Sequence, residues 1–219
     1  MNLIQYNFPE TQFIREEHPK TQIYLHHTAG NSNPFNVFKS WETNRERIAT
    51  CVVIGGLPGK SKDFKDGDVV QGFSSKFWGF HLGLKESTFQ KFGVPYRSLD
   101  RSSIGVEICN WGQLTLKNGK FYNYVNRIVP QNEVIELEKP HRGFKYYHNY
   151  TDAQIEATKD LLLLWKERYN IPLKYNEDIW DVNARALKGE PGVYTHNSVR
   201  FDKVDVYPHP KLIQMLKSL

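Results

Sequence analysis

The chain has 219 residues, of which 39% are hydrophobic, 14% aromatic and 24% charged, and this composition excludes a disordered, collagen-like or coiled-coil protein. The formal charge of +5 favours a polyanionic partner, but no dense run of lysine and arginine with interleaved aromatics marks a nucleic-acid groove, so we expect no nucleic acid. No apolar run approaches the ~20 residues of a membrane helix, and residues 1–10 lack the pattern of a secretory signal. We therefore expect cytoplasmic synthesis and no membrane partner.

Four short apolar runs in the first half of the chain predict buried strands. They lie at residues 21–27, 50–55, 68–71 and 103–109. Cys51 and Cys109 fall inside such runs, and we expect both to be buried as small hydrophobes. Residues 28–33 have the composition of a turn, and Pro34 suits the first turn of a helix that continues through Trp41. A loop is expected at 56–67.

The second half predicts one hairpin and two helices. Asn118-Gly119 is typical of a two-residue turn between strands 114–117 and 120–122. Thr151 and Gln154 form a capping box for a helix over 152–169, and a last helix is expected at 211–219. Since strands interleave with helices and no linker interrupts them, we expect one mixed α/β domain over 1–219.

An aromatic-rich insertion is expected around residues 113–150, most of it irregular. Its tyrosines could form the wall of a cleft or cover an exposed sheet edge, and the sequence leaves both interpretations open.

Two distant segments together offer the ligands of a catalytic zinc. His26 and His27 end the first predicted strand, and His196 and Asp205 lie in a late segment with few signals of regular structure. Two imidazoles and a carboxylate are a known ligand set for such a metal. Taken alone, His26 could be a histidine at a strand end whose hydrogen bonds are all made within the protein. Residues 196–205 could likewise be a polar surface loop. Successive strand residues face opposite ways, so only one of the adjacent histidines readily serves a given site.

Glu107 and Lys203 could supply the remaining chemistry. Glu107 lies inside an otherwise apolar strand, where an acid is unfavourable unless it has a task, although a solvent-facing edge strand would also tolerate it. On the metal side of its strand it could move a proton between water and a leaving amine. Lys203, two residues before Asp205, could hold a developing oxyanion.

These motifs resemble the zinc-dependent N-acetylmuramoyl-L-alanine amidases of the type 2 family, to which phage lysins belong and peptidoglycan recognition proteins are related. The resemblance runs from about residue 21 to the end and rests on four matches: 26–29 to His-x-[Ser/Thr]-Ala, 103–107 to Ser-Ile-Gly-[Ile/Val]-Glu, His196 with Lys203 and Asp205 to the late His…Lys-x-Asp segment, and 80–83 to [Trp/Phe]-His-x-Gly. It implies a central mixed β-sheet flanked by helices.

The resemblance also implies the roles of individual residues. His26, rather than His27, would bind Zn²⁺ with His196 and Asp205, while Glu107 and Lys203 would be catalytic. His81 would line the substrate cleft, and Trp78 could stack on a sugar or be buried in the core. The family usually has proline after the last ligand, whereas Val206 follows Asp205 here, which leaves Asp202 and His209 as alternatives. His18, His141 and His148 match no ligand position and are expected on the surface.

The implied activity is hydrolysis of the amide between N-acetylmuramic acid and L-alanine in peptidoglycan or a muropeptide, by a monomer. A receptor that binds peptidoglycan on the same fold without cutting it is the alternative. The setting stays open among a phage lysin, an enzyme acting on cytosolic muropeptides and an antibacterial toxin.

Overall fold

The computed structural model of the chain describes residues 3–30 and 32–219, and its centre is a six-stranded sheet. The strands are ordered β1 (Leu3–Gln5), β4 (Val69–Gln71), β3 (Val52–Ile54), β5 (Ser103–Ile108), β2 (Gln22–His27) and β11 (Gly192–Thr195). Neighbouring strands are parallel except β3 and β4, which are antiparallel. The predicted mixed sheet is thereby confirmed.

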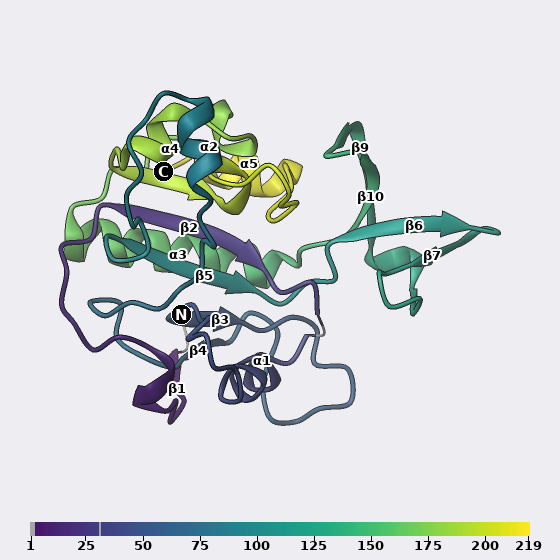
Figure 1. The fold of residues 1–219 in the computed structure, drawn as a ribbon. Coiled ribbons are helices and arrows are strands. Elements are labelled where there is room, and N and C mark those ends of the chain that lie inside the picture. Colours follow the sequence, from purple (N-terminus) through teal and green to yellow (C-terminus); the bar gives the residue numbers. More distant parts are fainter. Residues whose placement is uncertain (1–2, 31) are drawn as a thin grey trace.

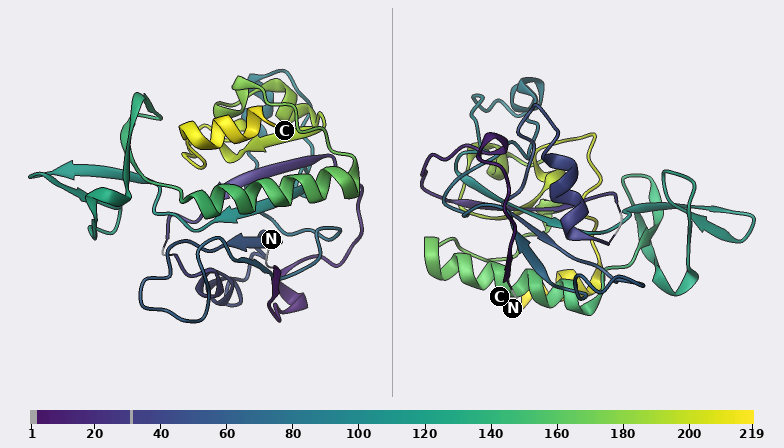
Figure 2. Two further views of the ribbon diagram at one scale, coloured as in Figure 1. Left: turned by 180° about the vertical axis from the view of Figure 1, so that it is seen from behind. Right: turned by 90° about the horizontal axis from the view of Figure 1, so that it is seen from below.

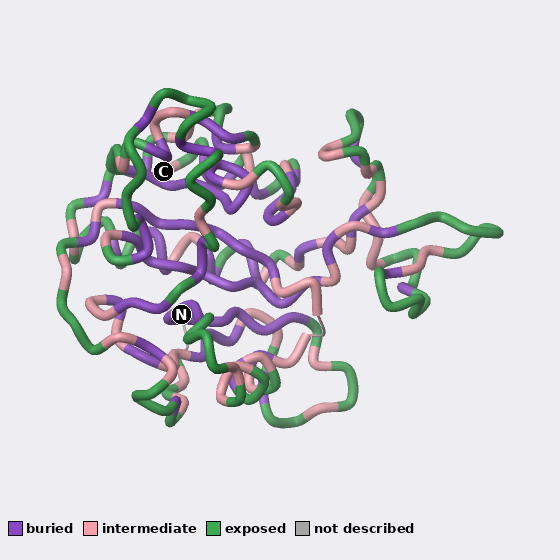
Figure 3. Tube along the Cα trace, viewed as in Figure 1, coloured by how far each residue is buried: buried purple, intermediate pink, exposed green. Residues whose placement is uncertain are grey.

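Helices cover both faces of this sheet (Figures 1 and 2). The helix α3 (Asp152–Tyr169) crosses one face and packs against α5 (Pro210–Lys217), while α1 (Pro34–Trp41) lies on the opposite side. Every residue of β2 and β5 is buried, as the continuous purple of the central strands in Figure 3 shows. Such double coverage is what apolar parallel strands require.

The predicted helix boundaries have local chemical causes. At α1, the side chain of Asn33 accepts hydrogen bonds from two backbone amides, and Pro34 occupies the first turn. At α3, Thr151 and Gln154 form the expected capping box, and Asn170 ends the helix in the left-handed region at φ 55°. The remaining helices are short: α2 (Glu86–Lys91), α4 (Ala184–Lys188) and the 3-10 turns at Glu10–Gln12, Gln131–Glu133, Glu177–Trp180 and His196–Ser198.

A second, antiparallel sheet projects from the body and is called the arm here (residues 113–148; Figure 1). Its strands are ordered β8 (Ile128–Val129), β7 (Lys120–Tyr122), β6 (Gln113–Lys117), β10 (Phe144–His148) and β9 (Val134–His141). Asn118 and Gly119 turn the β6–β7 hairpin at φ 50° and 71°, as predicted. The strands of the arm pair with neither edge strand of the central sheet, so strand pairing gives the sheet-edge interpretation no support.

Two further expectations differ from the structure. β9 and β10 occupy a stretch that was expected to be irregular. β11 lies in a segment with few strand signals, and its four residues form a strand because they pair with β2.

The expected turn at 28–33 includes Asn31, which lies outside the described residues. Cys51 and Cys109 are buried free thiols, as predicted. Within residues 3–30 and 32–219, no helix combines the length and apolar character needed to cross a lipid bilayer.

Candidate metal centre and cleft

The candidate ligands meet at the carboxyl edge of three parallel strands. His26 is the penultimate residue of β2 and lies beside Glu107 of β5 in register, while His196 follows directly after β11. Parallel strands bring their carboxyl ends to one edge of the sheet, where ligand sites form. Segments 170 residues apart in the chain thus converge.

Three acceptor atoms face one another at this edge. The Nδ1 atoms of His26 and His196 are 3.0 Å apart, and Oδ2 of Asp205 lies 3.3 Å from the first and 3.0 Å from the second. The ligand atoms of these three buried residues all lie within 4.8 Å of one another. The structure therefore groups Asp205 with the two histidines. The alternatives are engaged elsewhere: Asp202 pairs with Lys85 at 2.8 Å, and His209 contacts Asn149 at 2.7 Å.

The far ring nitrogens fix which imidazole atoms are free to bind a cation. Nε2 of His196 lies 3.0 Å from the Leu82 carbonyl oxygen, which can only accept, so Nε2 carries the hydrogen and Nδ1 keeps its lone pair. Nε2 of His26 contacts Nδ1 of His81 at 3.0 Å. Two imidazole nitrogens and a carboxylate that converge in this way suit a divalent cation, and this set of side chains matches zinc.

Burial perturbs the protonation of these groups. It lowers the pKa of His26 to about 4, helped by the neighbouring charge of His196. Burial alone would raise the pKa of Asp205, but the charge and hydrogen bond of His196, with those of His26, hold it well below its ordinary value. Burial and the charge of Asp205 raise the pKa of Glu107 well above 4.5, against the opposing charge of Lys203. The centre thus favours a neutral His26 imidazole beside an ionised Asp205.

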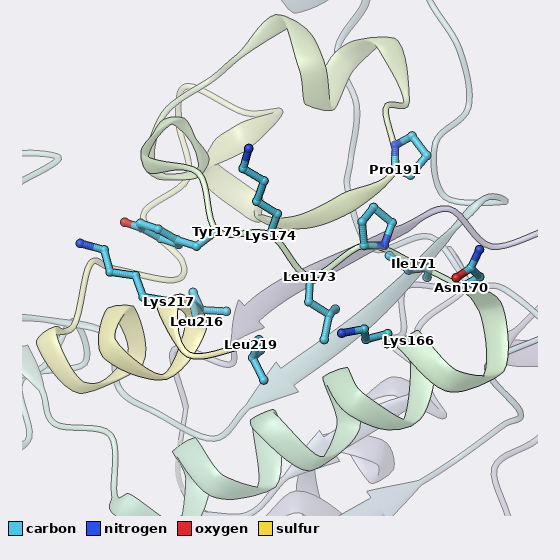
Figure 4. A pocket seen from close by; sticks show the side chains of 11 residues that line it. Lys166, Asn170, Ile171, Leu173, Lys174, Tyr175, Pro191, Leu216, Lys217 and Leu219 are labelled. Atoms are coloured by element: carbon cyan, nitrogen blue, oxygen red, sulfur yellow. The ribbon is translucent and has the colours of Figure 1, made fainter.

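The three residues line a cleft of about 540 Å³. Glu107, Lys203 and His81 line the same cleft. Its walls come from α1, residues 48–50, the segment 202–205 and, from the arm, Gln113 and Tyr124. A larger groove of about 910 Å³ lies beside the end of α3 and α5 (Figure 4). The described residues lining that groove include no histidine, cysteine or acid, so it offers neither metal ligands nor an acid–base pair.

The two residues predicted to contact substrate are placed differently. His81 lines the cleft, but both its nitrogens bond to protein: Nδ1 to His26 at 3.0 Å and Nε2 to Oγ of Ser103 at 2.9 Å. Trp78 is buried outside the cleft, packed edge-on against Phe80 at 5.4 Å. Its position argues against a sugar contact and for the core alternative.

The other histidines have structural partners. His27 points away from His26, and its Nδ1 contacts the Tyr150 hydroxyl at 2.9 Å. His141 and His148 were expected on the surface, but both are half-buried, and His148 contacts Glu133 at 3.3 Å. They end β9 and β10, the two strands in the stretch that was expected to be irregular.

Comparison with known proteins identifies the family. A family model described as N-acetylmuramoyl-L-alanine amidase (Amidase_2) matches residues 16–210. The chain belongs to this amidase family. No curated protein sequence matches it.

Solved structures share the fold of this chain at low sequence identity. PlyL is 14% identical with a TM-score of 0.54, and the match covers 99% of this chain and 98% of PlyL. A mutant endolysin from Bacillus subtilis is 14% identical with a TM-score of 0.52, over 100% and 97% of the chains. AmiD from E. coli, in complex with anhydro-N-acetylmuramic acid-L-Ala-D-gamma-Glu-L-Lys, is 16% identical with a TM-score of 0.53, over 92% of this chain and 59% of AmiD.

Proposed function

We propose that this amidase hydrolyses the amide bond between N-acetylmuramic acid and L-alanine in peptidoglycan, with Zn²⁺ held by His26, His196 and Asp205. The observation that carries the proposal is the convergence of one ligand atom from each of these three residues in a cleft that Glu107 and Lys203 also line. Bound there, zinc would supply Lewis acidity toward the scissile carbonyl and the attacking water.

Glu107 is the proton carrier of this proposal. Its strand register with His26 sets it beside the ligand cluster, and its raised pKa suits a carboxyl group that takes up a proton and gives it back. It accepts a proton from the attacking water and delivers it to the alanine nitrogen as the amide bond breaks. Lys203 lines the same cleft and stabilises negative charge on the carbonyl oxygen.

The test is digestion of purified peptidoglycan, with and without a zinc chelator, followed by mass spectrometry. We expect zinc-dependent release of peptides that begin with free L-alanine, while the glycan strands stay uncut. Intact peptidoglycan and intact soluble muropeptide in the presence of zinc would instead favour the non-catalytic receptor.

Replacement of the proton carrier sharpens this test. Glu107→Gln should keep zinc bound and lower turnover by about 10²- to 10⁴-fold, the usual contribution of a general acid–base group. The matched control is Glu167→Gln, at an exposed position on α3, which should leave turnover unchanged. Full activity of the Glu107→Gln protein would contradict the assignment.

A further inference from the structure

On the side that faces away from the ligand cluster, both proposed metal-binding histidines contact consecutive residues of one loop. Nε2 of His26 contacts Nδ1 of His81, and Nε2 of His196 contacts the carbonyl oxygen of Leu82, each at 3.0 Å. One dipeptide, 81–82, therefore contacts the far side of both imidazoles.

A buried carboxylate in turn holds this dipeptide. Oδ1 of Asp100 accepts hydrogen bonds from the backbone amides of His81, at 2.8 Å, and Leu82, at 3.0 Å. Asp100 is only 5% exposed, which is unfavourable for an acid unless its oxygens are bonded. Because one oxygen fixes both amides, the positions of the two histidine partners are coupled.

One arrangement of the hydrogens in this network satisfies every contact and leaves Nδ1 of His26 unprotonated. In it, the Ser103 hydroxyl donates to the Asp100 carbonyl oxygen at 3.5 Å and accepts from Nε2 of His81 at 2.9 Å. Nδ1 of His81 is then an acceptor and takes the hydrogen of His26 Nε2. The Nδ1 lone pair of His26 is thereby left facing Asp205.

From this network we infer that Asp100, His81 and Ser103 are positioning residues, which set the tautomer and the orientation of both metal-binding histidines through the 81–82 dipeptide. The inference rests on the proposed metal centre. His81 has no ring nitrogen left for substrate, since the network uses both. Hydrogen-bond partners of this kind contribute about 10- to 100-fold to metal affinity.

The experiment compares two side chains of equal shape at position 81. Asparagine can present its Oδ1 where His81 presents Nδ1, whereas leucine fills the same space without an acceptor. Zinc affinity is measured by competition with a chromophoric chelator, and metal geometry by the absorption spectrum of the cobalt-substituted protein. We expect His81→Leu to weaken zinc binding about 10- to 100-fold and to change the cobalt spectrum. His81→Asn should recover most of the affinity and a spectrum close to that of the unmodified protein.

A second pair tests the carboxylate without touching a residue that contacts the metal ligands. Asp100→Asn keeps an oxygen for the two amides, and Asp100→Leu removes it. Zinc affinity should fall in the leucine variant and stay near the original in the asparagine variant. If the leucine variant does not fold, the pair at position 81 still decides the question.

The outcomes separate this inference from the proposed function. If the unmodified protein binds no zinc, the metal centre itself is wrong and the positioning role is wrong with it. If it binds zinc and the folded His81→Leu protein binds equally tightly, the metal centre stands and the positioning role is overturned. Equal weakening by leucine and asparagine would also overturn it, because side-chain shape rather than the acceptor would then matter.

Discussion

At the scale of single residues, the candidate metal centre places a second acid, Glu107, close enough to the carboxylate of Asp205 to feel its charge. Burial and the charge of Asp205 both disfavour ionised Glu107, and the raised pKa means that the folded chain holds this proton more tightly than the unfolded chain does. Stability from this proton is therefore complete below the ordinary glutamate pKa of 4.5 and is lost as the pH rises through the folded pKa.

We accordingly expect Glu107→Gln to stabilise the metal-free protein near neutral pH. The gain should shrink as the pH approaches 4.5, where the glutamate itself becomes protonated. Thermal unfolding with a chelator present, at both pH values, measures the effect. An equal melting temperature for the two proteins at neutral pH would show that the buried charge carries no penalty.

Sequence motifs predicted the candidate ligands and Glu107 and singled out His81 for a different role, but they gave no sign of Asp100. His26, His196 and Asp205 each stand in a recognisable local pattern, because metal ligation demands particular side chains. Asp100 has no such pattern: it binds backbone amides 18 and 19 residues away, which any sequence can supply. Side chains that bond to backbone are therefore hard to find from one sequence.

At the scale of elements, strands were predictable where they are apolar and buried on both faces, as in β2 and β5. In the arm, the β6–β7 hairpin was predictable from its Asn-Gly turn, but β9 and β10 were not, because these two strands are largely exposed and mix charged with aromatic residues. Two arm residues, Gln113 and Tyr124, reach the cleft, and Tyr124 remains 62% exposed beside the ring of Trp111 at 6.5 Å. The arm thus extends one wall of the cleft, as one of the two initial interpretations had it.

This wall should affect binding more than chemistry. Tyr124→Ser is expected to raise KM for muropeptide several-fold with little change in kcat, since Tyr124 lies in the wall and away from the ligand cluster. Tyr96→Ser, at another exposed tyrosine that does not line the cleft, is the control. Identical kinetics for the two variants would exclude a role for the arm in binding substrate.

At the scale of the whole molecule, a bound ion would connect β2 with the segment after β11. An ion that binds only the folded chain stabilises it by about 2.7 kcal/mol at a free concentration of about 100 times Kd. For a chain of this size that corresponds to about 5–10 °C in melting temperature. We expect zinc to produce a shift of this order in the unmodified protein and none in His196→Ala. A shift that persists in the variant would mean that zinc acts elsewhere.

The position of β11 at the edge of the sheet, next to β2, also orders events during synthesis. His196 is made 170 residues after its partner His26. At about 5–20 residues per second, the ribosome needs roughly 9 to 34 seconds to cover that distance. Until β11 has emerged and paired with β2, the nascent chain contains His26 but neither His196 nor Asp205. A polypeptide that is still being translated, or that ends prematurely, therefore lacks a complete candidate metal centre.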